Sequence, residues 1–159
     1  MTRSTSALVI GFVLAGAVAA SPSIAMEGHA LLAPSDVKWG PAPPVLPPGA
    51  EAAVLSGNPE KAEPFVIRLK APKGYHVPPH SHSQMEAVTI LSGTLAMGDG
   101  DTADRAKARA LPAGGLAVMP AGTTHWVYAD EDTILQINGM GPFDIKYVNA
   151  KDDPQRKSQ

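Results

Sequence analysis

The 159-residue sequence contains no cysteine, which excludes disulfide bonds, thiolate metal ligands and thiol catalysis. Aromatic residues make up only 5% of the chain, and the formal net charge is −2. No cluster of Lys and Arg is visible, so the basic surface that nucleic-acid binding requires is not expected. These absences predict a domain stabilised by apolar packing, helped by a metal ion or by oligomerisation.

Long apolar runs are also missing, apart from one near the N-terminus. An uncharged run of small apolar residues, Ala7–Ala20, follows Arg3. The run is shorter than the roughly 20 residues that a membrane-spanning helix needs, and a cut after Ala25 places small residues at −3 and −1. We therefore predict that residues 1–25 are a signal peptide, with Ala20 as the second cleavage choice. The mature protein is then periplasmic or secreted and free of the membrane.

Proline and glycine are abundant, with 16 and 15 residues, and they leave few windows in which a helix of normal length could form. Between the turn formers lie short runs in which apolar and polar side chains alternate, as in half-buried strands. This pattern predicts an all-β protein built as a sandwich or barrel. Strands are expected at Ala52–Ser56, Phe65–Lys70, Ala87–Leu91, Thr94–Met97, Leu116–Met119, Trp126–Tyr128, Thr133–Asn138 and Ile145–Val148.

After the signal peptide, the sequence predicts three further parts. Residues 26–60 form an N-terminal arm and the first strands, residues 61–150 form the barrel, and residues 151–159 form a charged tail that we expect to be disordered. The arm includes Gly40–Gly49, which holds five prolines and cannot be a central strand. We expect it to lie over the barrel or against a partner subunit. Asp101–Ala110 is expected as a solvated loop or a single helical turn.

Candidate chemistry is concentrated in four polar residues. His80, His82 and Glu86 share parity, so their side chains project to one face if a single strand runs through them without a bulge. Two imidazoles and a carboxylate would then point into the barrel together. His125 follows some way along the chain and could close the same site if the two strands face each other, which spacing alone does not show.

The stretches around these residues resemble both signature motifs of the cupin superfamily. The first motif is Gly74, five residues, His80, one residue, His82, three residues, Glu86, six residues and Gly93; the second is Gly114, five residues, Pro120, one residue, Gly122, two residues and His125. The second motif departs from the family only at its end, where cupins usually have Asn and this chain has Ala129. That Asn is typically not a metal ligand.

The resemblance implies a cupin-type double-stranded jelly-roll barrel with one metal site. In cupins, the residues at the positions of His80, His82, Glu86 and His125 typically bind one divalent Mn, Fe, Ni, Cu, Zn or Co ion inside the barrel. Three imidazoles and a carboxylate also suit such ions on chemical grounds. Two alternatives stay open: Glu86 acts as a catalytic base beside a three-histidine metal, or the four residues are ordinary polar groups.

Several other residues are weaker candidates. His76 shares parity with His80, but two prolines intervene, and we expect it at the surface or at a pocket rim. Trp126 has opposite parity to His125 and should face away from the metal. Gln136 and Asn138 either line the cavity or face solvent.

The leading functional hypothesis is an exported mononuclear metal-dependent oxygenase, a dioxygenase type of chemistry, that acts on a small-molecule substrate. With four protein ligands, an octahedral ion keeps two positions open for substrate oxygens or O2. The alternatives are a metal-dependent isomerase or lyase, and a non-catalytic barrel in which tetrahedral zinc is closed by its four ligands. Whether the protein is an enzyme stays open. Because cupins often form dimers, a homodimer is an expected assembly, with Gly40–Gly49 as a segment that could be exchanged.

Overall fold

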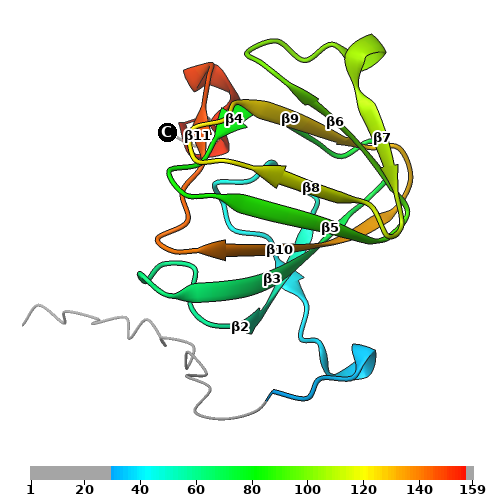
Figure 1. Cartoon of the computed structure of the whole chain (residues 1–159), viewed down its shortest axis with the longest axis vertical. Helices are drawn as coiled ribbons and strands as arrows, with labels where there is room; N and C mark the ends of the chain where they lie inside the picture. The colour runs from blue at the N-terminus through cyan, green and yellow to red at the C-terminus, as the bar shows by residue number, and fades with distance from the viewer. Residues whose placement is uncertain (1–29, 157–159) are drawn as a thin grey trace, which may run out of the picture.

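The computed structural model describes residues 30–156, and it confirms the all-β prediction (Figure 1). The predicted signal peptide, residues 1–25, lies outside the described residues. Two antiparallel sheets face each other and form a jelly-roll barrel. Within residues 30–156, no helix is long and apolar enough to cross a membrane.

Each sheet brings together strands that are far apart in the sequence. The first sheet has the order β1 (Gly40–Pro41), β2 (Glu51–Ser56), β3 (Pro64–Ala71), β10 (Thr133–Met140), β5 (Glu86–Ser92) and β8 (Leu116–Met119). The second sheet has the order β11 (Lys146–Tyr147), β4 (His76–Ser81), β9 (His125–Ala129), β6 (Thr94–Asp99) and β7 (Arg109–Pro112).

The core fills the space between the two sheets. Strand β10 shows how the sequence produces it, since Leu135 and Ile137 are buried whereas Gln136 between them is only half-buried. This alternation is what a strand with one inward face requires. Apolar side chains from both sheets, such as Ile90 of β5 and Leu95 of β6, are at most 2% exposed and belong to one cluster.

Every strand expected from alternation is present, with ends that differ by a few residues. Strands β1, β4 and β7 were not among the expected strands, although a strand through His80 was assumed for the candidate site. Strand β7 begins inside Asp101–Ala110, where the structure also has a single 3-10 turn, Arg105–Lys107. This turn agrees with one of the two expectations for that stretch. Another 3-10 turn, Pro34–Asp36, precedes β1.

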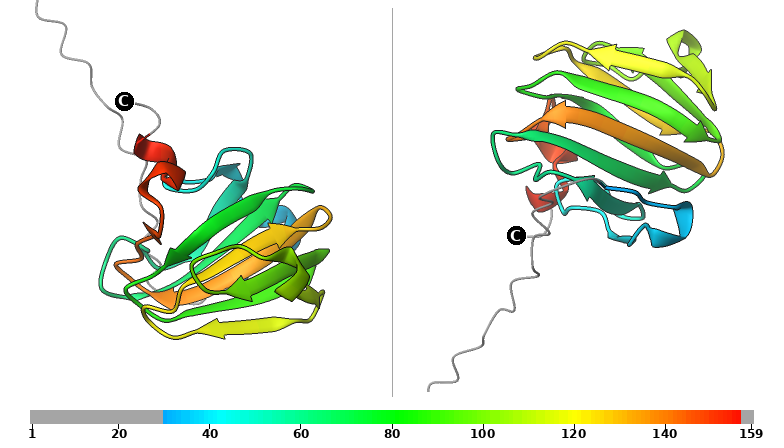
Figure 2. Two further views of the ribbon diagram at one scale, coloured as in Figure 1. Left: turned by 90° about the horizontal axis from the view of Figure 1, so that it is seen from above. Right: turned by 60° about the horizontal axis from the view of Figure 1, so that its bottom comes forward.

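The expectation of a disordered tail is wrong as far as Arg156. Two 3-10 turns, Ala150–Asp152 and Pro154–Arg156, form there (Figure 2). The Asn149 side chain accepts a hydrogen bond from the backbone N–H of Lys151 and so caps the first turn. Charge and a proline predicted disorder, but this local cap is not visible from composition.

The proline-rich segment Gly40–Gly49 lies over its own barrel, as one of the two expectations held. Its first two residues form the edge strand β1 against β2. Two tyrosine hydroxyls hold the rest, because Tyr75 donates to the carbonyl of Pro47 at 2.9 Å and Tyr147 donates to the carbonyl of Val45 at 2.8 Å. Proline has no backbone N–H to donate, so a proline-rich segment does not form a regular ladder and its carbonyls stay open to other donors.

Candidate metal centre

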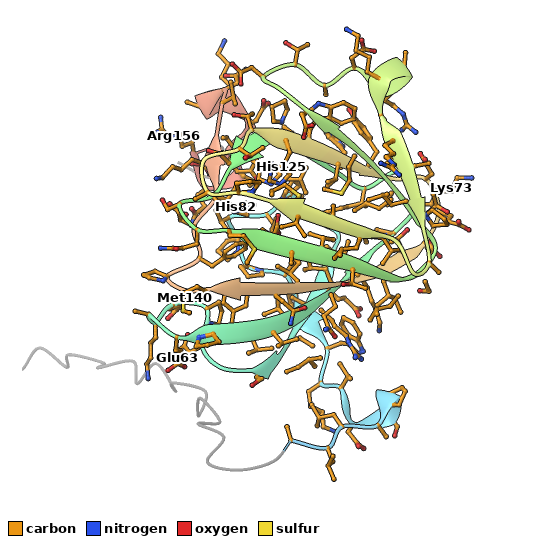
Figure 3. All side chains as sticks on the ribbon, in the orientation of Figure 1. Glu63, Lys73, His82, His125, Met140 and Arg156 are labelled. Carbon is orange, nitrogen blue, oxygen red and sulfur yellow. The ribbon has the colours of Figure 1, made fainter. Side chains whose placement is uncertain are left out.

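Four buried polar side chains converge at one end of the barrel. His80 of β4 and His125 of β9 are direct partners across the second sheet. Glu86 is the first residue of β5 in the first sheet, and His82 lies in the connection between β4 and β5. Figure 3 shows His82 and His125 as sticks between the two layers. The structure thus brings together all four residues that the sequence singled out.

The prediction that strand parity on a single strand brings three of them together, however, is wrong. His80, His82 and Glu86 do not share the face of one strand, because β4 ends at Ser81 and Glu86 belongs to the opposite sheet. The ladder between β4 and β9 also has an irregularity between Val77 and His80. The chain turns from one sheet to the other between His82 and Glu86, so the carboxylate approaches the histidines from across the barrel.

The side chains of the cluster are in close contact and are almost fully buried. His80, His82 and His125 each offer a ring nitrogen within 4.8 Å of the others, and the three residues are 2–4% exposed. Oε2 of Glu86 lies 3.3 Å from Nε2 of His125 and 3.4 Å from Nε2 of His82. A buried group of three imidazoles and a carboxylate is costly unless its polar atoms are satisfied.

The Nδ1 atom of each imidazole forms a hydrogen bond with a backbone carbonyl. Nδ1 of His80 lies 2.7 Å from the carbonyl oxygen of Pro78, Nδ1 of His125 lies 3.1 Å from that of Thr123, and Nδ1 of His82 lies 2.6 Å from that of Asp144. A carbonyl oxygen can only accept, so Nδ1 carries the proton in all three rings. The nitrogen left for a ligand in each ring is therefore Nε2. This is the arrangement that orients metal-ligating histidines.

The charge states of the cluster follow from burial and proximity. Burial, together with the neighbouring His125, lowers the pKa of His80 to about 3, so this ring is neutral. Burial alone would lower the pKa of His82, but the nearby Glu86 carboxylate raises it above its ordinary value. Burial would raise the pKa of Glu86, yet its contacts with His125 and His82 lower it to about 2. Glu86 is therefore a carboxylate.

Apolar side chains surround the carboxylate within its own sheet. Met119 of β8 and Gly139 of β10 are the direct partners of Glu86, and Phe65 of β3 is the partner of Gly139. A Cβ at position 139 would lie 2.8 Å from Cζ of Phe65, so glycine makes room for that ring. The ring of Phe143 stacks on His82 with centroids 4.4 Å apart. These groups shield the cluster from water.

The donor set fits a single divalent transition metal ion. Nε2 of His82 is buried and makes no hydrogen bond to the described residues, an arrangement that is costly without a further partner. Neutral imidazoles and a carboxylate are the ligands that first-row divalent ions prefer. The three buried histidines can hold such an ion, and the position of Glu86 makes it a fourth candidate ligand or an adjacent base.

The weaker candidates lie away from this cluster. His76 is exposed and stacks on Tyr128 at 5.2 Å, so it is a surface residue, as expected. Trp126 is 1% exposed and has Gly98 as its ladder partner. Gln136 accepts a hydrogen bond from Arg68 and donates one to Asn138, in a half-buried polar row with parity opposite to the core.

Three residues of the site were missed by sequence reasoning. Asp144 and Phe143, which contact His82, follow it by some sixty residues, and Ser83 binds the Asp144 side chain. An aromatic and an acidic residue between two short strands give no signal of their own. Only the short Ile145–Val148 strand next to them indicated that this segment returns to the barrel.

The fold and the buried histidine cluster together define a cupin. The chain belongs to the family described as a domain of unknown function, DUF4437, which matches residues 30–158 and is cupin-like. No curated protein matches the chain.

Solved cupin structures are similar in fold. The polyketide cyclase RemF from Streptomyces resistomycificus is 15% identical with a TM-score of 0.61, and the likeness covers 83% of this chain and 94% of that one. A candidate acetylacetone dioxygenase from Methylibium petroleiphilum PM1 is 17% identical with a TM-score of 0.61, over 80% and 85%. An RmlC-like cupin from Shewanella frigidimarina NCIMB 400 is 14% identical with a TM-score of 0.56, over 71% and 91%. At these identities the likeness shows the fold alone.

Proposed function

We propose that this protein is a mononuclear metal-dependent oxygenase, with one divalent ion held by His80, His82, His125 and Glu86. The observation that carries the proposal is the convergence of three imidazoles on one carboxylate, with each Nδ1 bound to a backbone carbonyl. Such tethering leaves each Nε2 directed to a common ligand and prepares the site before the ion arrives.

The residues around the ion would then have distinct tasks. When bound, a divalent ion supplies Lewis acidity and open positions for oxygen donors of a substrate. The three histidines would hold and orient the ion, while Glu86 would either complete the ligand set or accept a proton from the substrate; its contacts with His125 and His82 keep it a carboxylate, which suits the ligand role better. Phe143 and Met119 exclude water, which strengthens electrostatic interactions within the site.

The substrate class is a small organic molecule that presents one or two oxygen atoms. Phe65, Met119 and Phe143 are apolar neighbours of the cluster, which favours a substrate whose remaining surface is apolar. Enediols, phenols and β-diketones satisfy both conditions. The likeness in fold to a candidate acetylacetone dioxygenase is the reason to include β-diketones among them.

Oxygen uptake tests this proposal. The protein is stripped of metal, loaded anaerobically with Fe(II) or Mn(II), and assayed with an oxygen electrode against the three substrate classes. We expect uptake that depends on substrate and metal, that disappears in His82→Ala and that persists in His76→Ala, since His76 lies outside the cluster. No uptake with any metal would refute an oxygenase; product formation without uptake would instead support the isomerase or lyase.

We also propose that the protein acts after export, with residues 1–25 removed. The proposal rests on the apolar run Ala7–Ala20 and on the small residues that precede the expected cut after Ala25. The mature chain is then expected to begin at Met26. Edman sequencing of the protein from its own cell envelope or medium tests this. A chain that still begins at Met1 would contradict it.

A further inference from the structure

His82 differs from the other two histidines in how its ring is held. The carbonyls that accept from Nδ1 of His80 and His125 belong to Pro78 and Thr123, each two residues earlier in the same segment. The carbonyl that accepts from His82 belongs to Asp144, 62 residues away, at 2.6 Å. Two of the rings are thus oriented locally, whereas the third depends on a remote segment.

That segment is the β10–β11 connection, Gly141–Ile145. Asp144 forms hydrogen bonds to two neighbouring residues at the metal centre. Its backbone carbonyl accepts from His82, and its carboxylate accepts from both Ser83 N–H and Ser83 Oγ–H at 2.7 Å. Nζ of Lys146 donates to Ser83 Oγ at 2.6 Å and lies 3.3 Å from the Asp144 carboxylate. The side chains of Asp144 and of Lys146, the first residue of β11, therefore fasten this part of the chain to Ser83, the residue next to His82.

Apolar and backbone contacts complete the docking. Phe143 stacks on the His82 ring at 4.4 Å and meets Phe65 at 5.0 Å. Its backbone N–H donates to the carbonyl of Pro59 at 2.7 Å, and that of Gly141 donates to the carbonyl of Glu63 at 3.0 Å. The connection is thus bound to the barrel on one side and to the metal centre on the other.

We infer that Asp144 is a positioning residue for the metal centre: through Ser83 and its own carbonyl it holds His82 in the orientation that binds the ion. The inference rests on the proposed metal site and assigns a task to a residue outside the ligand set. It also makes metal retention depend on docking of the β10–β11 connection. By thermodynamic reciprocity, a bound ion in turn stabilises that docking.

Titration of the metal-free protein with Co(II), followed by its visible absorption spectrum, tests this inference. In Asp144→Ala we expect the affinity for Co(II) to fall by roughly 10- to 100-fold, the range typical for groups that orient a metal-binding histidine. The d–d bands should also shift, because His82 no longer approaches the ion in one orientation. Asp144→Asn should restore part of the affinity, since its amide oxygen can still accept from Ser83 N–H.

Two further variants make the result decisive. Ser83→Ala removes the hydroxyl partner without touching Asp144 and should lower the affinity in the same direction. Asp130→Ala is the matched control, because Asp130 is 36% exposed and paired with Arg105, as Asp144 is 38% exposed and paired with Lys146. The control should keep both the wild-type affinity and the wild-type spectrum.

The outcomes separate this inference from the proposed function. Wild-type protein that fails to bind one equivalent of Co(II) would refute the metal centre itself. Suppose instead that the wild-type protein binds Co(II), and that Asp144→Ala and Ser83→Ala show the same affinity and the same spectrum as the wild type. The metal centre would then stand, and the positioning role of Asp144 would be overturned. An equal loss in Asp130→Ala would overturn it as well, because the effect would then not be specific to the connection.

Discussion

At the scale of single residues, the site depends on which nitrogen of each histidine faces inward. Each Nδ1 is committed to a backbone carbonyl, which leaves each Nε2 for an ion. Removal of His82 or His125 takes away a proposed ligand and leaves the buried Glu86 carboxylate without one of its two close contacts. The ligand set therefore acts as a unit.

His82→Ala should abolish stoichiometric metal binding. The change removes a ligand whose Nε2 has no other hydrogen-bond partner among the described residues. Elemental analysis after loading and desalting measures the effect. His76→Ala is the control, because the His76 imidazole is exposed and stacks on Tyr128, away from the cluster. A His82→Ala protein that keeps one ion per chain would show that the site is misplaced.

Metal binding should weaken as the pH falls. Ligands must be deprotonated to bind, and Glu86 raises the pKa of His82 above its ordinary value, so His82 takes up a competing proton first on acidification. His80, with its pKa lowered to about 3, competes only in stronger acid. The affinity for the ion should therefore begin to weaken above the ordinary histidine pKa of about 6.5, and occupancy measured after equilibration between pH 8 and pH 4 should fall with the pH. An occupancy at pH 4 equal to that at pH 8 would argue against histidine ligation.

The sequence predicted the four site residues, but for a reason that only partly holds. Motif spacing identified His80, His82, Glu86 and His125, and the structure brings them together. Strand parity did not apply, because the chain crosses between sheets after His82. Contacts such as Asp144 to His82 could not be predicted, since they depend on how distant segments meet in space.

At the scale of elements, the strands place apolar groups beside the carboxylate. The row formed by Phe65, Gly139, Glu86 and Met119 crosses four neighbouring strands of the first sheet. Alternation along each strand predicted the buried faces, whereas the order of the strands in each sheet comes from long-range pairing. That order decides which residues become neighbours of Glu86.

Gly139→Ala should destabilise the barrel at this row. The new methyl group would lie 2.8 Å from Cζ of Phe65, so the ring must move beside Glu86. Overpacking of this kind typically costs about 1–3 kcal/mol. Urea unfolding measures the loss, and Gly40→Ala is the control because a Cβ there meets nothing within 4 Å. Equal stability of the two variants would contradict the packing described.

The proline-rich arm should loosen in alkali. Burial raises the pKa of Tyr75 to about 12 and also raises that of Tyr147, while both hydroxyls donate to carbonyls of the arm. A tyrosine ionises at about pH 10 in the unfolded chain, so the unfolded state loses protons first and stability falls as the pH rises above that value. Thermal unfolding between pH 9 and pH 11.5 should show a decline that is smaller in a Tyr75→Phe, Tyr147→Phe double variant. An identical decline in both proteins would contradict this account.

At the scale of the whole molecule, one edge of the barrel presents apolar side chains to the outside. Leu116 and Val118 of the edge strand β8 are 60% and 56% exposed. Exposed apolar groups on a strand edge favour association. We propose β8 as a contact of the expected homodimer, in addition to the exchange of Gly40–Gly49 considered above.

Sedimentation velocity tests this assembly. We predict a dimer for the wild-type protein and a monomer for Leu116→Lys with Val118→Lys, since two like charges at a shared edge repel. Val54→Lys is the control, because Val54 is similarly exposed at 58% but lies on β2, four strands away from β8 in the sheet. A monomeric wild-type protein would contradict the predicted dimer and would leave the metal centre unaffected.

We propose that three imidazoles and the Glu86 carboxylate bind one divalent ion inside the barrel. X-ray absorption at the K-edge of the metal, recorded on protein loaded with one equivalent, tests it most directly. We predict a first shell of three imidazole nitrogens with oxygen donors, and a six-coordinate ion that leaves positions for substrate. A first shell without imidazole scattering would contradict the claim.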